Sequence, residues 1–431
     1  MNENEIDIFL KEKAKSEQVK ISSEVGKSIS HALNNLPKHR NRVKPAIAVA
    51  ALLIVSVVTL AMIPPAYAEN LPILKSVFEF FGKSGDYTNN QYLKYATPVN
   101  QSVTDKGYTL TVNEVVADDN LIVVSYTAKG TKPFSKEFSD MPYVFGDLNQ
   151  SGKLLTNGTG QGKLLDEFTF AGYVSYFVGK DSIPKKLDLN FKVNQIDTTH
   201  GKWNFSFTVS KQSTSKESKV VYPKVTASLP FAKLKVSKVV LSRFANTLML
   251  NLSDTKQPGH YRFFVLDDQG KSLYVIGEDR GTVSEQNISF LKGKEELKGI
   301  TLIPFTFSAD YDLNPIKWLS ESTKVLPIVF RPSNDSTVSV IKIESDNLIT
   351  KVYYSVEGLY PDGYAAKMVL IDDKGKVILP RGGSEILIDP ETNEFMTEFE
   401  GLDQNREYKV ATPQLNDLTI FNENKISVPL K

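Results

Sequence analysis

The sequence predicts a mainly β protein in which a short helical segment and one transmembrane helix precede tandem antiparallel β-sandwich domains. Three observations support this fold class. One long apolar run lies near the N-terminus, and after it short runs of β-branched and aromatic residues alternate with turn residues. A hairpin pattern then recurs three times at a spacing of roughly 110 residues, which is the size of one sandwich domain.

The composition excludes several classes of protein. The chain has 51 basic and 50 acidic residues, so no bulk positive field marks a nucleic-acid partner. It has no cysteine, which rules out disulfides and thiolate metal or redox sites. The four histidines are scattered, and no metalloprotease, nucleophile-elbow, phosphate-loop or dinucleotide motif occurs. We therefore expect no enzyme activity, no catalytic residues, no cofactor and no metal site.

Residues 1–44 are expected to form a cytoplasmic helical segment with one apolar stripe. The stripe recurs at steps of three and four, Ser22 or Ser23 can cap its start, and Pro37 ends it. Its principal members are Val25, Ile29, Leu33 and Leu36. A helix of this length is marginal alone in water, so the stripe needs a cover. Two interpretations stay open, a helix lying on the membrane and a helix docking a cytoplasmic partner.

Residues 45–63 are expected to cross the lipid bilayer. The apolar core from Ala46 to Ile63 is interrupted only by Ser56 and Thr59. As a helix it would be roughly 27 Å long at about 1.5 Å per residue, close to a hydrocarbon core of about 30 Å. The sequence "AYA" before Glu69 also fits a signal-peptidase site, but the apolar run begins too far from the N-terminus for an ordinary leader. We expect a retained anchor.

Charge on the two flanks sets the orientation of this span. Lys38, Arg40, Arg42 and Lys44 precede it, whereas only Lys75 and Lys83 follow closely. Basic residues stay on the cytoplasmic side, so we expect a single-pass cell-membrane protein with a cytoplasmic N-terminus and an extracellular C-terminal region. Residues 69–96 would form a juxtamembrane helix and linker. The apolar stripe from Ile73 to Phe81 would lie on the bilayer or against the first domain.

The remaining chain is expected to form three sandwiches, at 97–210, 220–331 and 336–431, of immunoglobulin-like type. Their opening strand pairs are "GYTLTVNEVVADDNLIVVSYTA", "AKLKVSKVVLSRFANTLMLNLS" and "STVSVIKIESDNLITKVYYSVEG". A further hairpin follows each pair, at 143–155, 263–273 and 368–379. The polar tracts at 210–219 and 331–337 are interpreted as short linkers, which predicts a semi-rigid row of domains.

Glycine and aspartate in these hairpins are interpreted as turn formers. Gly152, Gly270 and Gly375 can adopt a positive φ that a Cβ would disfavour. The pairs Asp267-Asp268 and Asp372-Asp373 could be proposed as calcium ligands, but the spacing of a dedicated calcium loop is absent. Aspartate also accepts hydrogen bonds from its own turn, and we favour that role.

Residues Lys38 to Asp119 resemble a family of single-pass membrane proteins from spore-forming and related Gram-positive bacteria, called domain of unknown function 4179. The resemblance lies in "KHRNRVK", in "IPPAYAENLPILKSVFEFFG" and in "GYTLTVNEVVADDNLIVVSYTAKG". The region from Ala232 to about Leu273 is similar to a C-terminal domain often attached to that family.

This resemblance implies a regulatory protein. Members are often encoded beside extracytoplasmic-function sigma factors and are regarded as anti-sigma factors. It therefore implies a cytoplasmic sigma factor as partner of Val25, Ile29, Leu33 and Leu36, and an unknown envelope ligand for the outer region. The inside segment is shorter than the multi-helix domain of better-known anti-sigma proteins and lacks a zinc motif. The alternative is an anchored cell-surface binding or adhesion module with no signalling role.

Retention of the anchor gives a first prediction. We expect the mature protein to sediment with membranes and to migrate on a denaturing gel at the full mass of 48.1 kDa. N-terminal sequencing of the mature protein checks this. A shorter product that starts at Glu69 and appears in the medium would show that the apolar run is a cleaved leader.

Overall fold

The computed structural model describes residues 74, 76–83, 85–135, 144–178, 183–211, 213–254, 261–282, 285–291, 296–307, 316–346, 348–362, 367–381, 385–403 and 405–431. They belong to one compact unit, Leu74–Lys431. The predicted cytoplasmic segment 1–44 and the predicted span 45–63 lie outside the described residues. Within the described ranges, no helix has the length and apolar character needed to cross a membrane.

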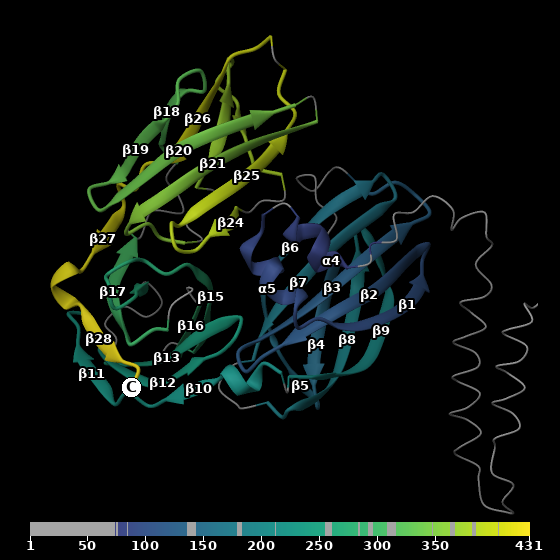
Figure 1. Cartoon of the computed structure of the whole chain (residues 1–431), viewed down its shortest axis with the longest axis horizontal. Coiled ribbons are helices and arrows are strands. Elements are labelled where there is room, and N and C mark those ends of the chain that lie inside the picture. The colour runs from purple at the N-terminus through teal and green to yellow at the C-terminus, as the bar shows by residue number, and fades with distance from the viewer. Residues whose placement is uncertain are drawn as a thin grey trace, which may run out of the picture. The chain divides into compact units, whose positions relative to one another are not determined.

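The prediction of a mainly β fold is confirmed, and the strands form antiparallel sheets (Figure 1). Sandwich 1, residues 97–210, pairs sheet A (order β1-β2-β3-β7-β6) with sheet B (order β5-β4-β8-β9). Its strands are β1 Thr97–Asp105, β2 Tyr108–Ala117, β3 Leu121–Gly130, β4 Val144–Gln150, β5 Lys153–Leu154, β6 Thr156–Asp166, β7 Thr169–Phe177, β8 Lys186–Ile196 and β9 Thr199–Ser210.

Strict alternation along the strands builds the core of sandwich 1. In β9 the side chains of Trp203, Phe205, Phe207 and Val209 are buried, while the residues between them face water. Successive strand residues point to opposite faces of a sheet, so this pattern places every aromatic ring of β9 between sheets A and B. The indole nitrogen of Trp203 donates a 3.0 Å hydrogen bond to the carbonyl of Tyr108, which satisfies its buried polar group.

Sandwich 2 comprises residues 219–307 together with residues 418–429. Sheet C has the order β10-β12-β13-β16-β15, with β11 also paired to β12, and sheet D has the order β14-β17-β27, with β28 also paired to β17. Its strands are β10 Lys219–Val221, β11 Val225–Ser228, β12 Lys233–Leu241, β13 Ala245–Ser253, β14 Tyr261–Leu266, β15 Val275–Thr282, β16 Glu285–Leu291, β17 Gly299–Phe307, β27 Leu418–Ile420 and β28 Ile426–Pro429. The 3-10 helices η2 Ser215–Glu217 and η4 Asn422–Asn424 flank it.

Sandwich 3 comprises residues 318–413. Sheet E has the order β18-β26-β22-β23, and sheet F has the order β19-β20-β21-β25-β24. Its strands are β18 Trp318–Ser322, β19 Ile328–Ser333, β20 Ser336–Ser345, β21 Ile349–Gly358, β22 Val369–Asp372, β23 Val377–Ile378, β24 Ile386–Asp389, β25 Glu394–Glu400 and β26 Tyr408–Pro413.

The boundary between sandwiches 2 and 3 differs from the predicted one at 331–336. The polar tract there is a tight turn, since Ser333 of β19 pairs with Ser336 of β20 in one sheet. The end of the chain then returns to sandwich 2, where β27 and β28 pair with β17 beside the C-terminus (Figure 1). Val428 and Leu430 are buried in the core of sandwich 2. A hairpin turn and a linker have the same composition, which is why the sequence alone misplaced this boundary.

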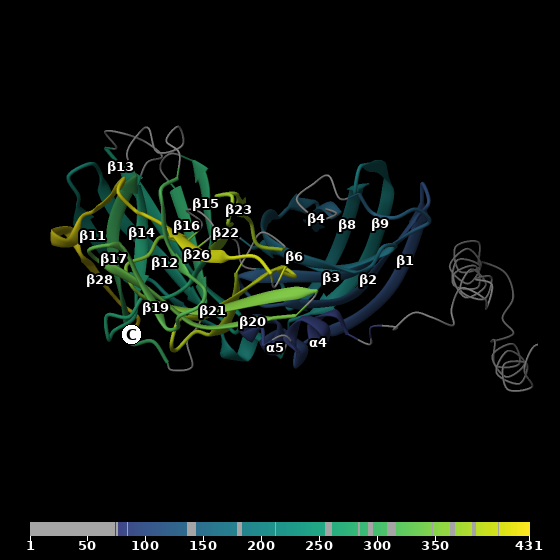
Figure 2. The same cartoon turned by 90° about the horizontal axis from the view of Figure 1, so that it is seen from above.

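Two short helices cover the outer face of sheet A. They are α4 Val77–Gly82 and α5 Tyr87–Leu93, and Figure 2 shows them on the side of β2 and β3 away from β4 and β8. The apolar stripe of α4 packs against the first sandwich through Val77, Phe78 and Phe81. The sequence indicated α4 but not α5. A helix of seven residues, with asparagines in its interior, is too short to leave a clear periodic signal.

The predicted strand pairs are present, and the hairpins at 143–155 and 368–379 form as β4–β5 and β22–β23, whereas the one at 263–273 closes through a single bridge between Leu266 and Ser272. The pairs β2–β3, β12–β13 and β20–β21 share one further feature, a register shift that follows Val112, Val236 and Val340 respectively. The shift is a β-bulge, which bends the strand and increases its twist. Gly152, Gly270 and Gly375 have φ of +86°, +84° and +79°, so their predicted role in tight turns is confirmed.

A buried polar junction joins sandwiches 1 and 2. It lies between the β2–β3 turn of sandwich 1 and the β12–β13 turn of sandwich 2. The carboxylate of Asp118 accepts hydrogen bonds from the backbone N–H groups of Asn120 and Leu121, at 2.8 Å each. Its other oxygen accepts from the Ser242 hydroxyl and the Phe244 N–H of sandwich 2, at 2.7 Å each. The Asn120 amide donates to Ser242 as well, at 2.8 Å. The polar tract at 210–219 packs beside this junction, where Thr214 donates to the carbonyl of Ala117.

The β20–β21 turn of sandwich 3 repeats the local hydrogen bonds of the β2–β3 turn. Asp346 accepts hydrogen bonds from the N–H groups of Leu348 and Ile349, at 2.7 Å each, as Asp118 does from its own turn. Asp346 is exposed, however, and Leu348 is 75% exposed. The chain therefore contains a docked and an undocked copy of one turn.

These two turns give a matched mutational test of the junction. Asp118→Ala should lower the free energy of unfolding by about 3 kcal/mol, because it leaves the buried N–H of Phe244 and those of its own turn without their acceptor, while the Ser242 hydroxyl keeps only the carbonyl of Ala245. Asp346→Ala removes the same turn bonds at an exposed site and should cost far less. Denaturant unfolding of both variants measures the difference. Equal losses would mean that the turn bonds, and not the docking contact, determine the stability.

Candidate functional site

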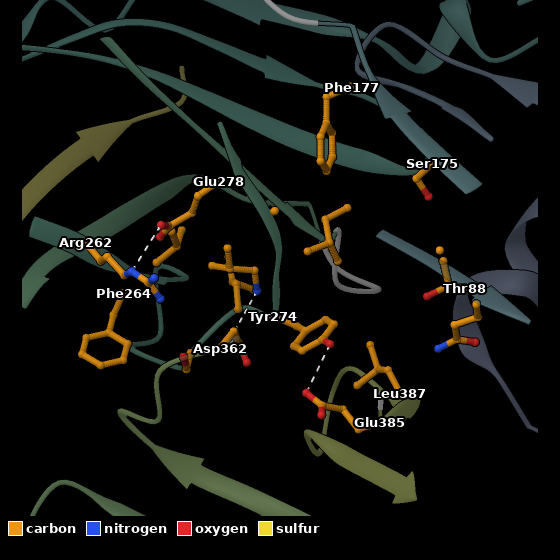
Figure 3. A pocket seen from close by; sticks show the side chains of 18 of the residues that line it. Thr88, Ser175, Phe177, Arg262, Phe264, Tyr274, Glu278, Asp362, Glu385 and Leu387 are labelled. Atoms are coloured by element: carbon orange, nitrogen blue, oxygen red, sulfur yellow. Dashed lines mark hydrogen bonds and ion pairs between the residues drawn. The ribbon is translucent and has the colours of Figure 1, made fainter. Parts of the chain in front are cut away.

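The sequence-predicted partner-binding residues, Val25, Ile29, Leu33 and Leu36, lie outside the described residues. The described part of the chain contains a cavity of about 730 Å³, where α5 meets all three sandwiches (Figure 3). Its walls come from the start of α5, from β6 and β7, from β14 and β15, and from the segments around residues 362 and 385 of sandwich 3. Pockets of roughly 300 to 1,000 Å³ are typical of small-molecule sites.

A buried ionic cluster forms the sandwich 3 wall of the cavity. Lys367 is only 2% exposed, and its ammonium lies 2.9 Å from the Asp362 carboxylate and pairs with Glu385 as well. The rings of Phe395 and Tyr274 lie 4.8 and 5.1 Å from the same nitrogen. Burial opposes the charged form of Lys367, but the two carboxylates outweigh it and raise its pKa well above the usual value. The lysine is therefore charged at neutral pH.

The cluster also attaches sandwich 2 to sandwich 3. Asp362 accepts a 3.0 Å hydrogen bond from the backbone N–H of Val275, and the Tyr274 hydroxyl donates to Glu385 at 3.4 Å (Figure 3). Burial, with the Glu385 charge next, raises the pKa of Tyr274 well above its ordinary value, so this hydroxyl keeps its proton. The segment that leads into β15 is thus held by side chains of sandwich 3.

Helix α5 and strand β7 supply the sandwich 1 wall. Asp86 caps α5, accepting from the N–H and the side-chain amide of Asn89 at 3.1 and 2.7 Å, and burial raises the pKa of Asp86. Phe177 of β7 lies directly on β15. A Cβ at Gly277 would be only 2.5 Å from its ring, so this close approach requires glycine.

Hydroxyl groups gather on the same wall. Tyr92, Tyr173 and Ser175 all line the cavity, and each is more than nine-tenths buried. Burial raises the pKa of Tyr92 and Tyr173 well above the ordinary value, so both hydroxyls are protonated and can donate hydrogen bonds. The nearby Asp86 charge raises both values further.

Sandwich 2 contributes the one cation that lines the cavity in the described ranges. Arg262 lies 3.8 Å from Glu278, and its guanidinium stands 5.7 Å from the centre of the Phe307 ring. Sandwiches 1 and 3 also contact each other nearby, because Lys163 of β6 pairs with Glu398 of β25 at 2.9 Å. A simple row of domains, as the linkers suggested, would not require this contact.

Among the described residues, no group of three or more His, Asp or Glu side chains is placed to hold a metal. The aspartates considered as calcium ligands make turn bonds instead. Asp267 accepts from the N–H of Lys271 at 2.9 Å, and Asp372 accepts from that of Lys376 at 2.8 Å.

Sequence reasoning did not find the cavity. Its residues come from α5 and from strands of three sandwiches, and no two walls share a short motif. The one local signal was Lys367, a lysine directly before the apolar run "MVLI", where a charged residue must be paired if the strand start is buried.

Part of the chain matches a known family model. Residues 38–130 match the family model "Domain of unknown function (DUF4179)". No curated protein matches the chain.

Solved structures give distant similarities. The conserved domain protein from Bacillus anthracis has a TM-score of 0.44 and 20% identity, over 59% of this chain and 91% of that chain. The uncharacterized protein lmo2446 from Listeria monocytogenes EGD-e, in complex with glucose, magnesium and calcium, has a TM-score of 0.17 and 11% identity, over 74% of this chain and 31% of that chain. The cycloalternan-forming enzyme from Listeria monocytogenes has a TM-score of 0.16 and 12% identity, over 68% and 29% of the two chains.

The ionic cluster gives a stability prediction. Lys367→Met should cost about 3 to 5 kcal/mol, because two buried carboxylates lose their cation. Part of this loss should return as the pH falls, since burial raises the pKa of the Asp362 carboxyl and the folded variant takes up a proton there.

Lys324→Met is the matched control, because Lys324 pairs with Glu407 on an exposed surface. Its effect should be far smaller. Denaturant unfolding at neutral and acidic pH measures both variants. A Lys367 variant as stable as the control would show that the cluster does not hold sandwich 3 in place.

Proposed function

The chain carries a DUF4179 domain at residues 38–130, and we propose that it is a membrane-anchored regulatory protein, an anti-sigma factor with an extracytoplasmic sensing region. The family resemblance supports this proposal through the sigma-factor partner that it implies. The order of segments along the chain supports it as well: a predicted cytoplasmic helix, an apolar run preceded by basic residues, and then the β unit.

The observation that carries the proposal is the capped apolar stripe before the span. Val25, Ile29, Leu33 and Leu36 recur on one face of a predicted helix. A passive anchor has no use for such a stripe, whereas a groove on a partner would cover it in the helix-in-groove mode. Burying each of these side chains would contribute roughly 1.5 to 3 kcal/mol.

The β unit is proposed as the sensing region. Its sandwiches have antiparallel sheets and spacings consistent with the immunoglobulin-like type that the sequence predicts. The cavity at their meeting point offers a place where an outside ligand could touch all three sandwiches at once. A change in their contacts would then alter how the inside helix holds its partner.

The stripe gives a direct test. Ile29→Asp with Leu33→Asp would place two charges in the partner groove, so the sigma factor should be released. A reporter driven by the neighbouring sigma factor should rise by more than tenfold, while the membrane level of the protein stays normal. The control pair is Lys27→Asp with Ser28→Asp, because both residues lie off the stripe.

A reporter that stays constant for this pair, and also after deletion of residues 1–36, would contradict the anti-sigma function. The anchored surface module would then be the better account, because it needs no cytoplasmic partner.

A further inference from the structure

Lys367 is a buried amine held between two carboxyl groups. Its side chain is 2% exposed, and its nitrogen lies 2.9 Å from Oδ1 of Asp362 and also contacts Glu385. The rings of Phe395 and Tyr274 lie 4.8 and 5.1 Å from the same nitrogen and help to exclude bulk water. An amine held against a carboxyl group in a desolvated site has the arrangement that precedes formation of an amide bond.

The surroundings of Asp362 favour attack on its carboxyl carbon. Its second oxygen, Oδ2, accepts a 3.0 Å hydrogen bond from the backbone N–H of Val275 (Figure 3). Negative charge develops on this oxygen when an amine attacks, and a fixed N–H donor stabilises such charge. Burial raises the pKa of Asp362, although the charge of Lys367 opposes the rise, so the carboxylate form is costly at this position. A neutral amide would remove that cost.

Glu385 is placed to move the protons that the reaction requires. Its Oε1 contacts the nitrogen of Lys367 and also accepts a hydrogen bond from the Tyr274 hydroxyl at 3.4 Å. Burial opposes the charge of Lys367 too, although the two carboxylates outweigh it. Transfer of one proton from the ammonium to Glu385 replaces an ion pair by two neutral groups, and burial lowers the free-energy cost of that change.

We propose that Lys367 and Asp362 join in an amide bond, which forms once after the chain has folded, with Glu385 as the proton carrier. The Lys367 nitrogen gives one proton to Glu385, attacks Cγ of Asp362 and forms the new C–N bond. Glu385 passes that proton, and then a second one from the nitrogen, to Oδ1. The C–O bond breaks, one water leaves, and Glu385 is again a carboxylate. Oδ2 becomes the amide oxygen, and no atom changes its oxidation state.

The site also supplies what this condensation lacks in water. Ammonium and carboxylate ions react poorly there, because both charges are well hydrated. Groups held in a reactive geometry behave as if their concentration were about 10⁵ to 10⁸ M. Asp362 and Glu385 line the cavity, so the released water can leave the reaction site. The product also removes an ion pair whose burial is costly.

The bond fixes one wall of the cavity. Asp362 holds Val275, the first residue of β15, and Lys367 lies two residues before β22. An amide between them attaches the side chain that contacts sandwich 2 to the start of a strand in sandwich 3. This inference goes beyond the proposed function and does not depend on it, since the bond forms without a sigma factor.

Mass spectrometry of the full chain, purified in detergent, tests the proposal. The wild-type mass should be lower by one water than its sequence requires. Trypsin cuts only after a lysine with a free side chain, so it should not cut after Lys367, and residues 352–374 should form one peptide that lacks one water. Fragmentation of this peptide should show a ring between Asp362 and Lys367. Trypsin should still cut after Lys211, which is 3% exposed and has one carboxylate partner, Asp119, within the described ranges.

Two variants test the assigned roles. Asp362→Ala lacks the carbon that is attacked, and Glu385→Gln lacks the proton carrier, so both should have the full mass and a normal tryptic cut after Lys367. Glu407→Gln is the matched control, because Glu407 pairs with Lys324 on an exposed surface. This control should retain the bond.

A third variant excludes a different loss of water at the same place. Asp362 is followed by Gly363, and an Asp-Gly sequence can lose water by closing onto its own backbone as a succinimide. Lys367→Met removes the amine of the proposed bond but leaves the Asp-Gly sequence intact. Its mass should therefore be the full mass of its sequence.

Two outcomes overturn the proposal. One is a wild-type chain with the full mass and a normal tryptic cut after Lys367, and the other is a loss of water that persists in Lys367→Met. The wild-type peptide map decides the question even where a variant folds poorly. Neither outcome involves the sigma-factor reporter, so failure of this proposal is distinct from failure of the proposed function.

Discussion

The fully buried carboxylate of Asp118 is the constraint on which the arrangement of the β unit depends. Burial raises its pKa, since a charge in the interior is costly, and four hydrogen bonds offset that cost. Two of the four come from sandwich 2, through Ser242 and Phe244. Any rotation of sandwich 2 away from this turn would leave the carboxylate buried with half of its donors, or would expose it together with the apolar residues around it. The hydrogen bonds of Asp118 therefore fix the orientation of sandwich 2 against sandwich 1.

The junction also fixes one wall of the cavity. Phe244, whose backbone N–H bonds to Asp118, packs its ring edge-on against Tyr92 of α5, with centroids 5.1 Å apart. Helix α5 is thus held between sheet A and the β12–β13 turn. Tyr92 lines the cavity, and its ring is held on both sides, by Phe244 and by Phe78 at 5.4 Å. Interdomain packing and the ligand-facing surface are consequences of the same contacts.

The return of the chain to sandwich 2 constrains sandwich 3 in a different way. Strands β27 and β28 follow sandwich 3 in the sequence yet complete sheet D, and Ile426 and Val428 fill the core of sandwich 2. The outer face of sheet D, at Phe264 and Phe305, then packs with Leu359 of sandwich 3. Sandwich 3 is therefore inserted between β17 and β27 of sandwich 2, and the two sandwiches share an apolar boundary.

Sequence patterns predicted the strand pairs that neighbours in the chain form, and they missed the pairs and contacts between residues far apart in the sequence. Alternation and turn chemistry located β2–β3, β12–β13 and β20–β21, because each pair is formed by neighbours in the chain. The same reasoning could not see β28 joining β17, since strand pairing over more than a hundred residues leaves no local mark. The turns at Asp118 and Asp346, "ADDNL" and "SDNLI" at matched positions, share the aspartate that bonds its own turn, but one is buried and one exposed. Asn120, which donates to Ser242 of sandwich 2, corresponds to Leu348 in the exposed copy. The cavity residues come from several such separate segments, and for that reason the cavity could not be found from motifs.

The three contacts around the cavity differ in strength, and this difference bears on how a ligand could act. Sandwiches 1 and 2 meet through the buried Asp118 junction, and sandwiches 2 and 3 through the packing of Phe264 and Phe305 with Leu359 and through the Lys367 cluster. Sandwiches 1 and 3 meet through the Lys163–Glu398 pair, whose side chains are 28% and 11% exposed, and ion pairs that water reaches contribute little. Tyr87 of α5 adds a half-buried apolar contact with the core of sandwich 3. A ligand shifts an equilibrium only by its difference in affinity for the two arrangements. The contact between sandwiches 1 and 3 is the one that a modest difference could open or close, so we expect any ligand-dependent movement there.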